Sequence, residues 1–170
     1  MGLDITAYRQ LKKVDESEIK RDEDGEIDED AFDYDTHHHL YVNSHYPERA
    51  PEIQSDAVYT SAEDYGFRAC SYSGYNSWRN GLAELAGYDP IDDRHDKGAW
   101  ETDGGPFWEL INFSDCEGVI GSSVSKKLLA DFLAFDAAAK THRGEYFYEV
   151  YQEFTKGLTF AADDGALHFH

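Results

Sequence analysis

Two amphipathic helical patterns, joined by only four residues, constrain the fold most strongly. Apolar residues recur at helical spacing over about residues 122–140 and again over about 145–161. Because so short a connection turns the chain back on itself, the two helices are predicted to pack antiparallel. Their inward faces comprise Val124, Leu128, Phe132 and Phe135 in the first helix, and Phe147, Val150, Tyr151, Phe154 and Leu158 in the second.

A third helix is predicted over about residues 74–86. Its apolar positions fall on one face at 3.6 residues per turn, Ser73 is a suitable N-cap, and Gly87 is a suitable residue just beyond the end. The apolar face consists of Tyr75, Trp78, Leu82, Leu85 and Ala86.

Short β-branched and aromatic runs predict strands in the first half of the chain and at its end. The first strand is expected over residues 2–14, with an interruption near Arg9-Gln10, and the last over 166–170. Further strand candidates are 40–42, 57–59, 66–70 and 107–113. Because strands cluster early and helices late, we expect an α+β fold. A mainly antiparallel sheet would carry its three principal helices on one face, and residues 1–170 would form a single domain.

The charge is concentrated in one segment. The chain has 35 acidic and 15 basic residues, a formal net charge of −20. Residues 15–35 hold twelve acids and two bases, so half of the net charge lies there. We therefore predict an acidic loop or insertion over 15–36, solvated and mobile, with Asp24-Gly25 at a turn. A calcium loop is excluded, because Lys20 and Ala31 occupy the two end positions where acidic ligands are needed.

This composition also limits the partners. Phosphate contacts need clustered Lys and Arg, so direct nucleic-acid binding is not expected, whereas a basic protein partner is. No apolar run approaches the roughly 18 residues of a membrane span. The start of the sequence lacks a secretion signal, and two cysteines form no disulfide framework. A cytoplasmic protein without membrane contact is therefore expected.

The stretch Ser71–Arg79 is the first candidate site. Hydroxyl, amide and guanidinium groups gather there at the start of a predicted helix, where free N–H groups favour an anion. They could hold an anionic or sugar-like ligand. The alternative is that a serine caps the helix and the aromatic residues are core. The candidate ligand-binding residues here are Ser71, Ser73, Tyr75, Asn76 and Arg79.

The second candidate is the polar turn 112–118, with Asn112, Asp115 and Glu117. In an extended chain the two carboxylates point to one side, where they could bind a cation or act as acid and base. An ordinary polar turn before a helix is the alternative. His37-His38-His39 is the one metal-like cluster, but neighbouring side chains on a strand face opposite ways. We therefore expect no metal, no cofactor and no assembled catalytic set.

Several motifs together resemble a family of small bacterial and phage proteins. The resemblance rests on MGLDITAY at residues 1–8, SYSGYNSWR at 71–79, INFSDCEGVIG at 111–121, and the terminal Phe169-His170. It implies a prokaryotic or phage setting and transfers no catalytic role. Cys70 stands where the family pattern has Gly, and the acidic segment 15–35 lies outside the shared motifs.

Two functional hypotheses follow. The first is a non-catalytic acidic binding protein of bacterial or phage origin, an inhibitor that engages a basic nucleic-acid-handling or defence protein. The second is a small hydrolase or small-molecule binder with a pocket between residues 71–79 and 112–118.

Overall fold

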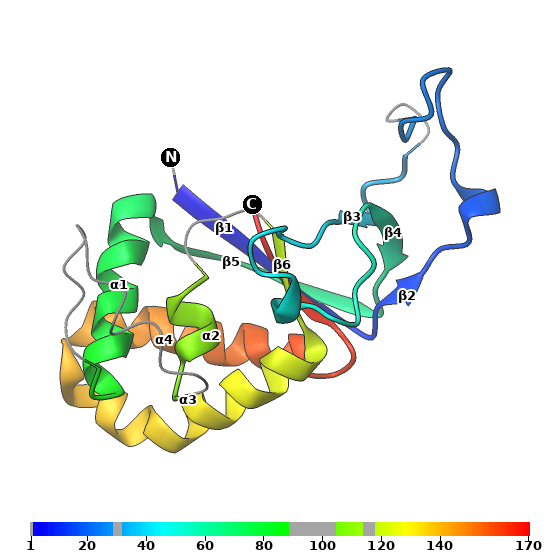
Figure 1. Ribbon diagram of the computed structural model, residues 1–170. Coiled ribbons are helices and arrows are strands. Elements are labelled where there is room, and N and C mark those ends of the chain that lie inside the picture. Colours follow the sequence, from blue (N-terminus) through cyan, green and yellow to red (C-terminus); the bar gives the residue numbers. More distant parts are fainter. Residues whose placement is uncertain (1, 29–31, 89–104, 114–117) are drawn as a thin grey trace.

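A four-stranded antiparallel sheet forms the centre of the protein, in the order β5-β1-β7-β6. The computed structural model describes residues 2–28, 32–88, 105–113 and 118–170 (Figure 1). The strands are β1 (Gly2–Arg9), β5 (Glu63–Ser71), β6 (Gly118–Gly121) and β7 (Ala166–Phe169). Because β7 pairs with both β1 and β6, the last residues of the sequence complete the middle of the sheet.

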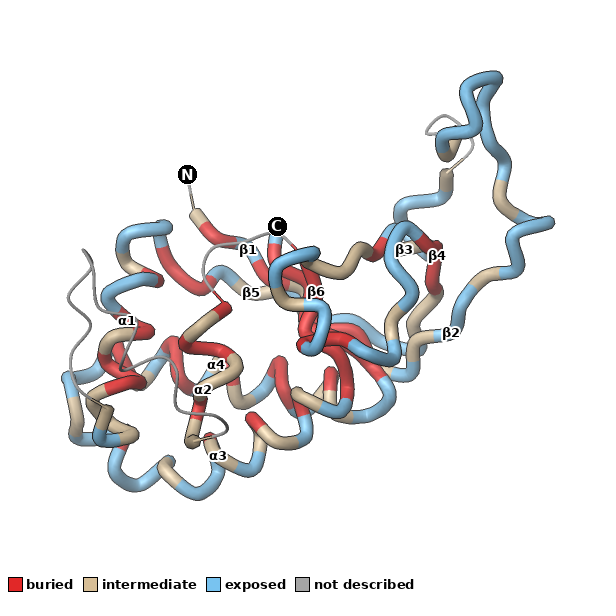
Figure 2. Tube along the Cα trace, viewed as in Figure 1, coloured by how far each residue is buried: buried red, intermediate tan, exposed pale blue. Residues whose placement is uncertain are grey.

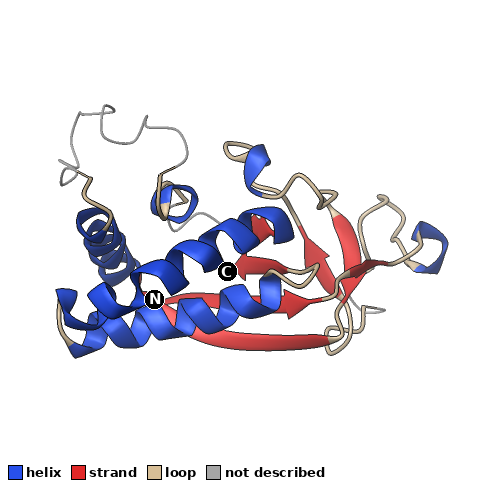
Figure 3. Cartoon of the chain, turned by 90° about the horizontal axis from the view of Figure 1, so that it is seen from below, coloured by secondary structure: helices blue, strands red, loops and turns tan. Residues whose placement is uncertain are grey.

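Three helices cover one face of this sheet: α1 (Tyr72–Leu85), α3 (Ser122–His142) and α4 (Glu145–Ala161). Figure 3 shows α3 and α4 side by side along the strands, which confirms the predicted antiparallel pair. The alternation of β1 places Leu3, Ile5 and Ala7 in the core beneath them. The predicted α+β class, with an antiparallel sheet and helices on one face, is confirmed.

A second, smaller sheet has the order β2-β4-β3, formed by β2 (Lys12–Lys13), β4 (Ala57–Thr60) and β3 (His38–Leu40). The interruption predicted at Arg9-Gln10 is the point where the chain leaves the first sheet for the second. Gln10 has a φ of 52°, and the amides of Gln10 and Leu11 donate to the carbonyls of Asp163 and Asp164 at 2.8 and 2.9 Å. A second, smaller core lies between the small sheet and the face of the first sheet that points away from the helices. Tyr8 and Tyr59 belong to it.

The strand predicted over residues 107–113 is wrong. The segment contains the short helix α2 (Trp108–Ile111), and its C-cap is Asn112. Apolar side chains at 107, 110, 111 and 113 are all buried, and a short run of this kind does not distinguish strand from helix by periodicity. Phe107, with a φ of 58°, turns the chain into the helix.

The predicted Ser73 cap also needs correction, and the cap of α3 comes from elsewhere in the chain. Helix α1 starts at Tyr72, because the Ser71 hydroxyl accepts the Gly74 amide at 3.1 Å, so Ser71 and not Ser73 is the N-cap. Helix α3 has no local side-chain cap. The carboxylate of Glu52, which follows the 3₁₀ turn η3 (Pro47–Arg49), accepts the Ser123 amide at 2.6 Å and the Ser123 hydroxyl at 3.1 Å. A distant residue therefore caps the longest helix.

Candidate functional site

The acidic segment projects from the molecule at the end opposite α1 (Figure 1). We call the described residues between 15 and 36 the acidic arm. It leaves the small sheet at β2 and returns to it at β3. Figure 2 shows the arm almost entirely in the colour of exposed residues, whereas the buried residues gather in the body.

The arm is shaped by hydrogen bonds of its own main chain. The amide of Asp28 donates to the Lys20 carbonyl, and the amide of Asp22 to the Glu26 carbonyl, both at 2.9 Å. The Asp22 carboxylate accepts the amides of Asp24 and Glu26 at 2.9 and 3.0 Å. Gly25, with a φ of +87°, forms the tip. The predicted mobility of the segment stays a prediction, since these bonds describe its shape and not its motion.

Apolar residues anchor the arm to the small sheet. They surround a notch of about 80 Å³ at its base, formed in part by Ile19, Ile27 and Phe32 of the arm and by Val14 and Val58 beside it. The Val14 amide also donates to the Val58 carbonyl at 2.9 Å. Polar side chains, among them Glu18, Asp28 and Asp33, complete the lining of the notch. Tyr34 is exposed on the arm together with most of its acids.

The arm keeps its negative charge at neutral pH. Hydrogen bonds from Ser17 lower the pKa of Asp15, and hydrogen bonds from Thr36 and the Asp35 amide lower the pKa of Asp33. One ion pair within the arm joins Arg21 to Glu16 at 2.9 Å. Most of its carboxylates are exposed and open to a cationic partner.

Of the two segments predicted to form a pocket, the structure describes residues 71–79 fully and the second, 112–118, only at residues 112, 113 and 118. The structure brings the described residues of these two segments together, but their polar groups bond to one another. Tyr75 is fully buried and donates its hydroxyl to the Phe113 carbonyl at 3.2 Å. Arg79, 8% exposed, donates to the Ile111 carbonyl at 2.7 Å and to the Asn76 side chain at 2.8 Å. Tyr75 and Arg79 therefore connect α1 to α2.

The remaining predicted site residues lie apart from a shared centre or outside the described residues. Ser71 and Ser73 are exposed at the start of α1, where their hydroxyl oxygens lie 3.4 Å apart. Asn112, the C-cap of α2, is half-buried. Asp115 and Glu117, the predicted carboxylate pair, lie outside the described residues.

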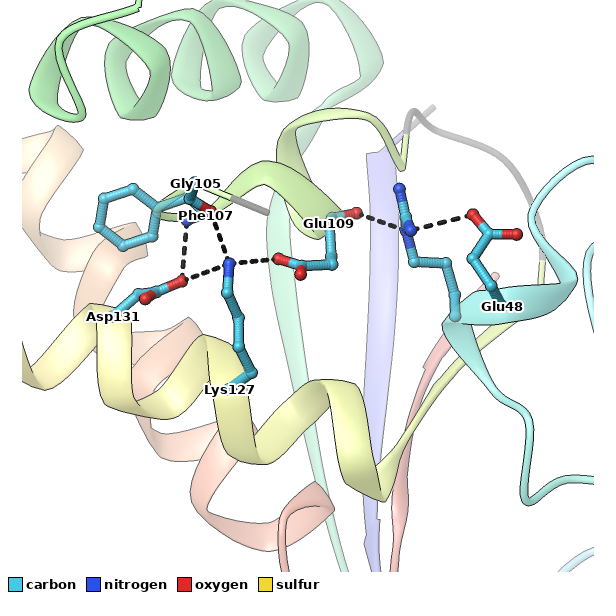
Figure 4. A network of polar contacts seen from close by, with 7 residues as sticks. Glu48, Gly105, Phe107, Glu109, Lys127 and Asp131 are labelled. Carbon is cyan, nitrogen blue, oxygen red and sulfur yellow. Dashed lines mark hydrogen bonds and ion pairs between the residues drawn. The ribbon is translucent and has the colours of Figure 1, made fainter. Parts of the chain in front are cut away.

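Residues 105–113, which we call the clamped segment, are held by two further cations that the sequence did not single out. The Lys127 ammonium donates to the Gly105 carbonyl at 2.6 Å (Figure 4). It also contacts the carboxylates of Glu109 and Asp131, at 2.5 and 2.9 Å. Asp131 also accepts the amide of Phe107 at 2.9 Å. Lys127 thereby ties the start of the segment to α3.

Arg49 holds the other side of α2. Its guanidinium, in a residue only 2% exposed, donates to the Glu109 carbonyl at 3.1 Å and to the Glu48 carboxylate at 2.9 Å (Figure 4). It also lies over the Trp108 ring, 4.4 Å from the centroid. No local pattern could have identified the role of Arg49, because Glu109 lies 60 residues away in the sequence. The spacing of Lys127 and Asp131 indicates an i,i+4 pair, but not the contact with Gly105, 22 residues away.

A histidine cluster lies on the face of the main sheet opposite the helices. His38 stacks on Tyr8 with ring centroids 4.1 Å apart, and His168 lies 4.1 Å from His170. Burial above all, and then its histidine neighbours, lower the pKa of His168 to about 3. Burial also lowers the pKa of His38. His168 is therefore neutral at pH 7, where it packs between the two sheets and carries no charge.

In the described part of the chain, no group of three or more His, Cys, Asp or Glu side chains is arranged to hold a metal ion. Within the same residues, no helix combines the length and apolar character that crossing a membrane requires. Comparisons with protein-family models, with curated proteins and with solved structures found no match. The functional argument therefore rests on the geometry of the chain itself.

Proposed function

We propose that the chain is a non-catalytic acidic binding protein of bacterial or phage origin that acts in the cytoplasm. In this proposal the acidic arm engages a basic surface of a nucleic-acid-handling or defence protein and inhibits it. The bacterial or phage setting rests on the resemblance of the sequence motifs, and the partner class rests on charge.

One observation carries this proposal: the acidic arm projects from the body, it is anchored at its base by Ile19, Ile27 and Phe32, and most of its acids are exposed. Both ends of the arm enter the small sheet, which limits how far the acids can spread. An acidic surface that is already shaped loses less conformational entropy on binding than a free tail. Lys and Arg side chains on a partner would complement it.

The alternative, a small hydrolase or small-molecule binder at residues 71–79 and 112–118, receives less support. Tyr75 and Arg79 were expected to contact the ligand, yet they donate to main-chain carbonyls of the clamped segment. A buried Arg with such bonds stabilises the fold, and its displacement by a ligand would leave carbonyl groups without donors.

Native mass spectrometry of the full chain with a panel of basic nucleases and effector complexes tests the proposal. At least one panel member is expected to form a complex that weakens as salt rises, because exposed charges are screened. Association with none of them, or association that salt does not alter, would contradict an arm that binds by charge.

A matched pair of triple variants locates the contact. The arm variant combines Glu23→Gln, Asp24→Asn and Glu26→Gln, and leaves Asp22 to hold the hairpin. The control removes the same charge from the body with Asp64→Asn, Glu145→Gln and Glu149→Gln, all exposed. We expect the arm variant to weaken binding about tenfold, or about 1.4 kcal/mol, and the control to change it little. Equal losses in both would show that net charge, and not the arm, drives binding.

A further inference from the structure

A pocket of about 640 Å³ lies where five parts of the chain meet, away from the acidic arm and the clamped segment. The link after β1, the residues after η3, strand β4, the first turns of α3 and the turn before β7 all line it. Pockets that bind small organic molecules have volumes of this order, about 300–1,000 Å³.

The walls of this pocket are fixed by the fold. The Leu11 amide donates to the Asp164 carbonyl at 2.9 Å, which holds two opposite parts of the rim together. The Tyr59 hydroxyl accepts a hydrogen bond from the Gln54 amide at 2.8 Å, which fixes the position of the Tyr59 ring. At Gly165, a Cβ atom would come within 1.8 Å of the Tyr8 carbonyl oxygen, so the turn is packed directly on β1. A preformed pocket of this kind requires little ordering when it binds.

Part of the lining is apolar, and the rest holds three charged side chains that each have a partner. Leu11, Ile53 and Tyr59 supply the apolar wall. Lys126 pairs with Asp164 at 3.5 Å. Glu52 accepts both donors of Ser123 at the start of α3, where the positive end of the helix dipole offsets its charge. Each charged group in the pocket therefore has a partner within the protein.

This balance decides the charge of a suitable ligand. A ligand with a full charge would have to compete for Lys126 or Glu52, and would leave Asp164 without its counterion or the first turn of α3 without its cap. The carboxylate oxygens and the ammonium still have hydrogen-bonding capacity that a neutral group can use. Hydroxyl groups both donate and accept, and the flat face of a ring would cover the apolar wall.

We propose that this pocket binds a neutral, hydroxyl-bearing ring compound, a chemistry that saccharides and nucleosides share. The ring lies on Leu11, Ile53 and Tyr59, and its hydroxyl groups bond to Glu52, Asp164 and Lys126. This inference is independent of the acidic arm and goes beyond the proposed function, because it assigns a second site to the molecule.

Saturation-transfer NMR of the full chain with two separate panels tests the inference and distinguishes the two sources. One panel holds neutral mono- and disaccharides with glucosamine and glucuronate, and the other holds nucleosides with their monophosphates. At least one neutral compound is expected to bind, with its charged counterparts at least about fivefold weaker, or about 1 kcal/mol. Absence of binding by every neutral compound at millimolar concentration, or equal binding by the charged ones, would overturn the inference.

Two variants then place the ligand in this pocket. Ile53→Trp fills the pocket and is expected to weaken binding at least about tenfold. Leu133→Trp, at a position 64% exposed on α3, introduces the same side chain away from the pocket and is expected to leave binding unchanged. Equal binding by the wild type and a folded Ile53→Trp protein would refute the assignment.

Lys126→Met provides a test that does not depend on core packing, since the Lys126 side chain is 58% exposed. Loss of the ammonium leaves Asp164 without its partner, so the pocket should now favour a cation. For a saccharide ligand the preference is expected to move toward glucosamine, and for a nucleoside toward an amino-substituted nucleoside. An unchanged preference in this variant would contradict the charge balance on which the inference rests.

Discussion

The acidic arm and the clamped segment both contain little regular secondary structure, yet they use charge in opposite ways. In the arm, main-chain groups pair mostly with one another or with aspartate side chains such as Asp22, and most of the acids remain on the surface. One exposed cation, Arg21, donates to the Gly25 carbonyl at the tip, at 3.0 Å. In the clamped segment, three cations reach the main chain: Lys127 at Gly105, Arg49 at Glu109 and Arg79 at Ile111.

The difference shows how a chain with few bases distributes them. A four-residue helix cannot satisfy its own last carbonyl groups, and cations are well suited to that position. Arg49 and Arg79 are therefore buried against main-chain carbonyls instead of lying among the acids of the surface. In the arm the cation that reaches a main-chain carbonyl, Arg21, is exposed and not buried, and most of the negative charge is left for a partner.

The largest expected effect follows from removing a cation of the clamped segment. Arg49→Met keeps the apolar stem but leaves the Glu109 carbonyl without its donor and removes the stacking on Trp108. We expect the free energy of unfolding to fall by about 3 kcal/mol, because a buried hydrogen bond to a charged group is lost. Urea unfolding followed by tryptophan fluorescence measures the change.

Arg68→Met is the matched control, since the Arg68 side chain is 63% exposed and lies 3.9 Å from its partner Asp4. It should alter stability by less than about 0.5 kcal/mol. If the two variants lose similar stability, the clamped segment does not depend on buried cations and the contrast with the arm fails.

Acidification should next destabilise the body of the protein, where His168 is buried in β7. His168 has a pKa of about 3 in the folded protein and an ordinary value of 6.5 in the unfolded chain. Below pH 6.5 the unfolded chain therefore takes up a proton that the folded protein does not, and stability falls progressively toward pH 3. Between pH 6.5 and 5 the expected loss is roughly 2 kcal/mol.

Urea unfolding at pH 7, 6 and 5 measures this slope, and His168→Phe should flatten it, whatever its effect on stability at pH 7. Asp15 and Asp33 of the arm should remain charged over this range, because hydrogen bonds lower their pKa values. Identical slopes in the two proteins would mean that another group controls the acid sensitivity. The lowered pKa of His38 acts in the same direction, so a small slope is expected to remain.

The helices and the sheet class could be predicted because their signals are local. The face of α4 repeats along 17 residues, and the alternation of Leu3, Ile5 and Ala7 identifies β1. The sequence did not predict α2, since four buried apolar residues suit either periodicity. Nor did it predict the Glu52 cap of α3, which lies 71 positions from Ser123.

The candidate site shows the same limit. The sequence predicted that residues 71–79 lie near 112–118, and in the structure Tyr75 and Arg79 bond to the carbonyls of Phe113 and Ile111. Composition indicated which groups were polar but not whether they would bond to a ligand or to the chain. That choice depends on Phe107 and α2, whose conformation is set by distant residues such as Asp131 and Arg49.

The smallest effect on global stability is expected in the arm itself. Asp22→Ala removes the acceptor of the Asp24 and Glu26 amides, so exchange of these two amides with solvent should become faster. Asp22→Asn is the matched control, because it loses the same charge but keeps a side-chain oxygen that can accept both amides. Residues 20–26 are exposed, so neither variant should change the free energy of unfolding by more than about 0.5 kcal/mol. Hydrogen exchange followed by NMR separates the two cases: equal loss of protection in both variants would mean that the charge, and not the acceptor, holds the hairpin. Unchanged protection in both would mean that the main-chain bonds alone shape the arm.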